Sequence, residues 1–166
     1  MSNAGTEELD DVEEVEEHVA RGSSVLDRIL VPIDFTMDSH RALGVALEMM
    51  RTHGSSVCVF HAAESAGSDD WLGGIGSPSV GGDWVSEAEG RLRRFLENVA
   101  PGSSSRVEVM AKCGLPVQTM RRAAQEWGAS LIVAPAGVHA RFFRSPAERL
   151  VHDSGVPVLV IPIDEA

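Results

Sequence analysis

The chain has 166 residues, 43% of them hydrophobic, and a net charge of −11, which is enough apolar material for one domain with a sizeable core. So acidic a chain is unsuited to bind nucleic acid or an anionic membrane surface, because both need clustered lysine and arginine. No apolar run approaches the roughly 20 residues of a membrane helix, and Cys58 and Cys113 lack metal-type spacing. We therefore expect a cytoplasmic protein with reduced thiols.

Residues 1–24 form an acidic leader built around the stretch "EELDDVEEVEEHVARGSS". The leader contains no apolar segment of the kind found in a secretion signal. Its few apolar residues recur at roughly helical spacing, which leaves two interpretations open. They can form a helical face that docks on the domain or on a partner, or the leader can be a solvated, frayed tail. These residues are Leu9, Val12, Val15 and Val19.

Strand and helix patterns alternate through the main domain, residues 25–166. Apolar runs predict strands at residues 28–34, 56–62, 106–111, 130–135 and 156–162. Apolar residues at helical spacing predict a helix after each of the first four strands. We expect Asp38-Ser39 to cap the first helix and Gly54 to end it. Gly114 and Pro116 should turn the chain into the third helix, and Ser145-Pro146 should open the fourth.

The segment between the second strand and the second helix, residues 64–83, is rich in glycine and shows no periodicity. It is long for a loop in a compact domain. We interpret it as an inserted loop, either a flap over a site or an insertion without a binding role. No Gly-Lys-Ser/Thr follows its glycines, so it is not a Walker phosphate loop.

This alternation predicts an α/β fold, in which a three-layer, doubly wound sheet of five parallel strands carries helices on both faces. The third strand alternates more than the others, and the last contains Pro157, which cannot donate to a ladder. Both features are typical of sheet edges and suit the strand order 3-2-1-4-5. A ligand would then bind at the carboxyl ends of strands one and four, with Asp34 facing the loop at residues 134–144.

The first turn, "DFTMDSH", decides among doubly wound families. It has no glycine, which argues against a dinucleotide-binding domain and weakens a flavodoxin-type phosphate loop. The acidic pair and the final lysine of a receiver domain are missing, as is the Ser-Gly-Gly-rich loop of an ATP pyrophosphatase.

Three stretches in order resemble the universal stress protein family, over about Leu26 to Ile163. They are "ILVPIDFTMDSHRAL", "CGLPVQTMRRAAQEWGASLIVAP" and "SPAERLVHDSGVPVLVIP". The resemblance implies a cytoplasmic protein of the stress response that forms a homodimer through its last strand, from Val156 to Ile161. Dimerisation has a physical motive, because an apolar sheet edge otherwise invites uncontrolled pairing.

ATP-binding members of that family carry Gly-x2-Gly-x9-Gly-Ser/Thr between the fourth strand and the fourth helix, where backbone amides approach the phosphates. In this chain Ser145 matches the Ser/Thr, Arg144 stands at the last glycine and Pro135 at the first, so that only Gly137 remains. The loop is also about four residues shorter than such a phosphate loop. The resemblance further implies that Asp34 reads the adenine or ribose end and that Ala62 lines the adenine pocket.

The candidate nucleotide or anion site therefore comprises Pro32, Asp34, Ala62, Gly137, Arg144 and Ser145. Structural roles stay open beside this one. Asp34 can cap the following turn, Ser145 can form a capping box with Glu148, and Arg144 can either grip an anion or lie in solvent. No residues form a convincing general base or metal-ligand set, so we expect neither catalytic residues nor a metal.

Two functions remain open. In the first, the protein is a dimeric binding or interaction module that contacts itself or a protein partner and has lost ATP. In the second, it is a nucleotide-binding stress protein with weak or no hydrolysis of ATP. The first is favoured, because the missing glycines are the ones that define ATP binding.

Overall fold

The computed structural model describes residues 24–63, 83–114, 116–136 and 155–162. Its strands are β1 (Arg28–Pro32), β2 (Ser56–Ala63), β3 (Glu108–Cys113), β4 (Leu131–Pro135) and β5 (Val158–Ile161). Its helices are α2 (Met37–His53), α3 (Trp84–Val99), α4 (Pro116–Trp127) and the short 3-10 helix η1 (Ser104–Arg106).

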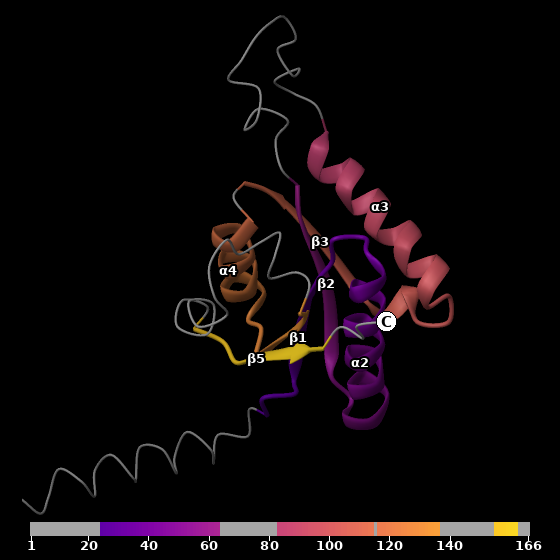
Figure 1. The fold of residues 1–166 in the computed structure, drawn as a ribbon, viewed down its shortest axis with the longest axis vertical. Coiled ribbons are helices and arrows are strands. Elements are labelled where there is room, and N and C mark those ends of the chain that lie inside the picture. The colour runs from indigo at the N-terminus through magenta and orange to yellow at the C-terminus, as the bar shows by residue number, and fades with distance from the viewer. Residues whose placement is uncertain (1–23, 64–82, 115, 137–154, 163–166) are drawn as a thin grey trace, which may run out of the picture.

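The strands form one parallel sheet in the order β3-β2-β1-β4-β5, which confirms the predicted topology (Figure 1). In the register, Pro32 of β1 lies beside Phe60 of β2, and Leu30 of β1 lies beside Ile132 of β4. Both strands expected at the edges, β3 and β5, lie there. Pro157 precedes β5, so the strand begins after the residue that cannot donate to the ladder.

Helices cover both faces of the sheet, as the alternating pattern predicted. Alternate strand residues point to opposite faces, and each face has its own core. On one face Ile29, Val31 and Val59 pack with residues of α2 and α3, and on the other Leu30, Phe60 and Ile132 pack with residues of α4. Figure 1 shows α4 on the opposite side of the sheet from α2 and α3. The fourth predicted helix, opened by Ser145-Pro146, lies outside the described residues.

The ends of α2 test the predicted caps. The helix begins at Met37 with Thr36 as its N-cap, so the expected cap at Asp38-Ser39 is wrong. The physical reason is local, because the Ser39 hydroxyl is drawn back to Asp34 and does not cap the helix. The C-terminal prediction is confirmed, since Gly54 follows the helix in the left-handed conformation with φ 73°.

Pro116 is the first residue of α4, also as predicted. The acidic leader, except Ser24, and the glycine-rich loop, except Asp83, lie outside the described residues. Among the helices that the structure describes, none has the length and apolar character needed to cross a membrane.

Candidate functional site

The carboxyl ends of the strands meet at one edge of the sheet, where the first turn of the chain leaves β1. The carboxylate of Asp34 accepts hydrogen bonds from side chains of this turn. Its Oδ1 accepts hydrogen bonds from the Thr36 backbone N–H at 3.0 Å, from the Thr36 hydroxyl and from the Ser39 hydroxyl at 2.6 Å. The Asp34 N–H in turn donates to Ser39 Oγ at 3.1 Å. The carboxylate therefore organises the entry into α2, which is the capping role that the sequence left open.

Phe35 follows Asp34 with φ 64°, and no other residue in the described ranges except glycine has a positive φ. A bulky residue in this region is strained and persists only where its surroundings hold it. Here the ring lies 4.7 Å from the His61 ring and 5.9 Å from the Phe95 ring, centroid to centroid. The Arg91 guanidinium lies 4.3 Å over the Phe35 ring, a cation–π contact. This cluster is not among the features expected from the sequence.

His61 links this cluster to the sheet. Its Nδ1 lies 2.8 Å from the carbonyl oxygen of Ile33, so this nitrogen carries the proton that it donates to the carbonyl. Residues 33–35, directly after β1, thus carry the His61 contact, the Asp34 carboxylate and the Phe35 ring. No local sequence signal predicts the cluster, because Phe35, His61 and Arg91 come from three separate elements.

Two further residues of the candidate site, Pro32 and Ala62, are apolar and buried. Ala62 is 3% exposed and belongs to the core against α4, and Pro32 is buried beside Phe60. The structure thus brings Pro32, Asp34 and Ala62 to the same edge of the sheet. Gly137, Arg144 and Ser145 lie outside the described residues. The last described residue before them, Ala136, donates its N–H to the Ile161 carbonyl at 2.8 Å.

Gly114 closes the same edge at the end of β3. Its N–H donates to the Ala63 carbonyl at 3.3 Å. Its φ is 141°, and a Cβ at this position would come within 2.7 Å of Thr119 Oγ1. Only glycine fits here without strain, which gives a structural reason for the glycine in the stretch "CGLP".

The two cysteines and the metal-binding side-chain types are further possible functional groups of the described residues. Burial, reinforced by the charge of Glu108, raises the pKa of the Cys58 thiol to about 12, so this thiol stays protonated at neutral pH. Cys113 is exposed. In the described part of the chain, no three His, Cys, Asp or Glu side chains are placed to hold a metal ion. The candidate-site residues that the structure describes offer two buried apolar side chains, Pro32 and Ala62, and the carboxylate of Asp34.

Comparisons with known proteins identify this architecture. The model of the universal stress protein family matches residues 26–162, whereas a search of curated proteins gave no match. A family member from Burkholderia pseudomallei is similar in structure, with 26% identity and a TM-score of 0.57 over 85% of this chain and 99% of that one.

Two similar structures were solved with nucleotides. A universal stress protein in complex with cAMP has 17% identity and a TM-score of 0.58, over 83% of this chain and 98% of that one. A universal stress protein from Archaeoglobus fulgidus in complex with dAMP has 19% identity and a TM-score of 0.51, over 83% and 99%. At these identities the likeness shows the fold, while the family model covers most of the chain. The chain therefore belongs to the universal stress protein family.

Proposed function

We propose that this universal stress protein acts in the cytoplasm, in the stress response, as a homodimeric binding or interaction module. Its interface is the last strand, β5 with the residues just before it. The observation that carries the proposal is the exposure of Leu159 and Val160, at 37% and 39%, within that strand. An edge strand with apolar side chains exposed on both of its faces is a template for pairing with another chain.

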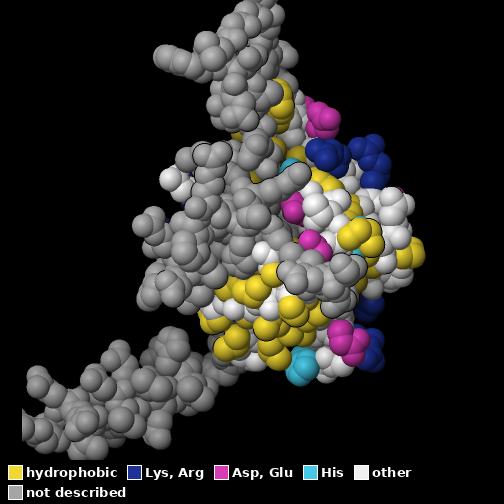
Figure 2. Space-filling view, viewed as in Figure 1, with side chains coloured by type: hydrophobic (Ala, Val, Ile, Leu, Met, Phe, Trp, Pro, Cys, Tyr) yellow, Lys and Arg dark blue, Asp and Glu magenta, His cyan; other side chains and the backbone are white. Residues whose placement is uncertain are grey.

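A groove beside β5 supports the same surface. A pocket of about 660 Å³ lies between α2 and β5, with Val45, Met49 and Ile161 among its apolar lining residues. Figure 2 shows hydrophobic side chains gathered around β5 and the adjoining part of the molecule. Arg41, Glu48 and His53 from α2 also line the pocket. An apolar centre with polar residues around it is the usual composition of a protein interface.

Light scattering after size exclusion tests the dimer. The wild-type protein should elute at twice the 17.7 kDa mass of the chain. Val160→Lys places a charge in the interface and should weaken dimerisation at least about 100-fold. Val85→Lys is the matched control, because Val85 is also 39% exposed but lies on α3, and it should stay dimeric. A wild-type monomer at about 100 µM would overturn the proposal.

The second candidate is nucleotide binding at the carboxyl edge of the sheet. The cAMP and dAMP complexes of the similar proteins favour it, as do the positions of Asp34, Ala62 and Pro32. Against it, the Asp34 carboxylate already holds the first turn of α2, and the sequence lacks most of the phosphate-loop glycines.

Calorimetric titration separates the two candidates. The module without nucleotide should show no binding of ATP with magnesium, cAMP or dAMP. A dissociation constant below about 100 µM for any of them would establish the second candidate instead. Arg144→Gly restores the last glycine of the motif, so it should create or improve ATP binding if Arg144 blocks the phosphate position.

A further inference from the structure

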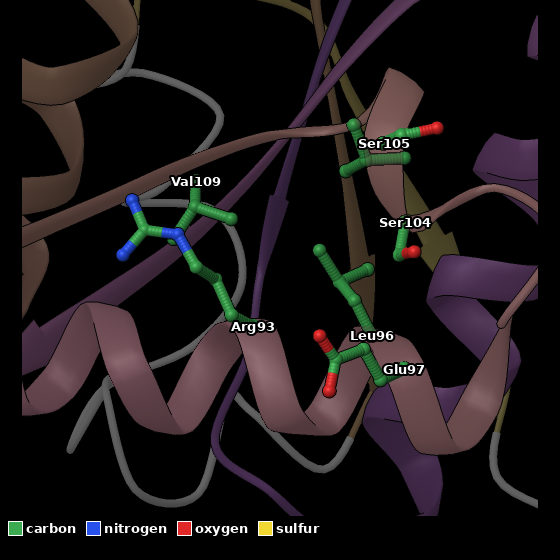
Figure 3. Close-up of a pocket in the computed structure, with 7 residues that line it drawn as sticks. Arg93, Leu96, Glu97, Ser104, Ser105 and Val109 are labelled. Atoms are coloured by element: carbon green, nitrogen blue, oxygen red, sulfur yellow. The ribbon is translucent and has the colours of Figure 1, made fainter.

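A second pocket lies at the opposite end of the sheet from Asp34. It has a volume of about 360 Å³ and lies where the C-terminal half of α3, the helix η1 and the amino end of β3 meet (Figure 3). This size falls within the range of pockets that hold small molecules. Of the candidate nucleotide site, the described residues Pro32, Asp34 and Ala62 do not line it.

The base of this pocket is apolar. Leu96 and Val107 line it and are almost fully buried, with 1% and 7% exposure, and Val109 of β3 completes the apolar part. Ser104 and Ser105 add hydroxyl groups from η1. Figure 3 shows Arg93 and Glu97 rising from α3 on the side of the helix that carries Leu96. The described lining residues thus combine an apolar surface with one cationic and one anionic side chain.

Arg93 and Glu97 do not form an ion pair with each other. Arg93 pairs with Glu89 at 3.4 Å, and the Arg93 side chain remains 60% exposed. Exposed pairs of this kind contribute little, so Arg93 can exchange that partner at small cost. Among the described residues, Glu97 takes part in no ion pair closer than 4.0 Å. Arg93 and Glu97 are one helical turn apart, which puts their side chains on neighbouring positions of the same face.

We infer that this pocket binds a small zwitterion of the α-amino acid class with an apolar side chain. The carboxylate contacts Arg93, the ammonium group contacts Glu97, and the apolar side chain packs on Leu96, Val107 and Val109. A simple anion would be repelled by Glu97 and by the net charge of −11, and a simple cation by Arg93. A neutral molecule would shield both charges from water without pairing them.

Leucine and two of its derivatives test the charge requirement. N-acetyl-leucine lacks the ammonium group and leucinamide lacks the carboxylate, while both keep the apolar side chain. Chemical shifts of ¹⁵N-labelled protein should move in α3 and η1 on titration with leucine. Both derivatives should bind at least about tenfold more weakly, because each loses one charge-assisted contact. Equal binding of all three compounds, or no shift at about 10 mM leucine, would overturn the inference.

Three variants of exposed α3 residues test the assignment to the pocket. Arg93→Gln and Glu97→Gln should each weaken leucine binding about tenfold or more. Arg94→Gln is the matched control, because Arg94 is exposed on the same helix but does not line the pocket, and its affinity should be unchanged. All three should keep the wild-type melting temperature within about 2 °C. An equal loss in Arg94→Gln, or unchanged binding in the first two variants, would contradict the assignment.

Discussion

The two edges of the sheet are built in different ways. β3 has a charged residue near each end, and α4 engages both. Glu108 accepts a hydrogen bond from Trp127 Nε1 at 3.0 Å, and Lys112 pairs with Glu126. β5 has only four residues, none of them charged, and two of its apolar side chains are exposed.

This difference shows which edge is prepared to meet another chain. Charged residues on an edge strand discourage pairing, because a second strand would have to bury them. β3 has this protection and β5 does not. Variants at the end of β3, at Cys58 in the neighbouring strand β2, at the contact between β3 and α4, and at Lys112 test this difference.

The largest effect is expected where β3 ends. Gly114→Ala should lower the free energy of unfolding by about 1–3 kcal/mol, because alanine is strained at this φ and its Cβ would press on Thr119. Urea unfolding measures the loss. Gly90→Ala in α3 is the control, since nothing lies within 4 Å of a Cβ placed at this position, and it should stabilise by up to about 1 kcal/mol. Equal effects at the two positions would contradict the requirement for glycine at the end of β3.

The buried thiol of Cys58 on β2, next to β3 in the sheet, makes the stability of the protein depend on pH. Burial raises the pKa of this thiol from 9.0 to about 12. A raised pKa of an acid favours the folded state below pH 9, and this stability is lost as the pH rises from 9 toward 12. The slope is at most about 1.4 kcal/mol per pH unit.

Urea unfolding between pH 8 and 11 measures this alkaline loss. Cys58→Ala should flatten it, whereas Cys113→Ala should leave it unchanged, because Cys113 is exposed. Thiol labelling of the native protein at pH 8 should modify Cys113 alone. Rapid labelling of Cys58 in the folded protein would contradict the buried, protonated thiol.

A smaller effect is expected where α4 holds β3. A double-mutant cycle of Trp127→Phe and Glu108→Ala should give a coupling energy of about 1 kcal/mol, the usual contribution of one hydrogen bond. Phenylalanine keeps an aromatic ring, and so retains part of the contact with Arg28, whose guanidinium carbon lies 4.1 Å from the Trp127 ring centroid. A coupling energy near zero would mean that Glu108 is not fixed by α4.

The smallest change in stability is expected from Lys112→Val, because Lys112 and its partner Glu126 form a partly exposed ion pair. Its effect should appear in self-association. The variant leaves Glu108 as the one charged residue of β3 and makes the carboxyl half of this edge apolar, so light scattering should detect species larger than the dimer at high concentration. An unchanged mass distribution would show that charge does not protect this edge.

The sequence carried enough information for the topology because burial leaves a direct signal. Continuous apolar runs identified the central strands, the alternating run identified β3 as an edge, and Pro157 did the same for β5. The start of α2 differs from the prediction, which used Asp38-Ser39 as the cap. The Ser39 hydroxyl donates to the Asp34 carboxylate instead of capping the helix.

Less of the candidate site could be predicted. Pro32, Asp34 and Ala62 reach the same edge, as the strand order required. The positive φ of Phe35 could not be foreseen, since contacts with His61 and Arg91 from distant parts of the chain hold it. The α3–β3 pocket escaped prediction for the same reason, because three elements create it only when they are packed together.

Hydrogen exchange followed by mass spectrometry can show which edge of the sheet pairs with a second chain. It compares peptides from β3 and β5 at protein concentrations below and above the dimerisation constant. Protection of the β5 backbone should rise with concentration while that of β3 stays constant, since only β5 gains a partner strand. Concentration-independent exchange of β5, or an equal rise at β3, would contradict pairing through β5.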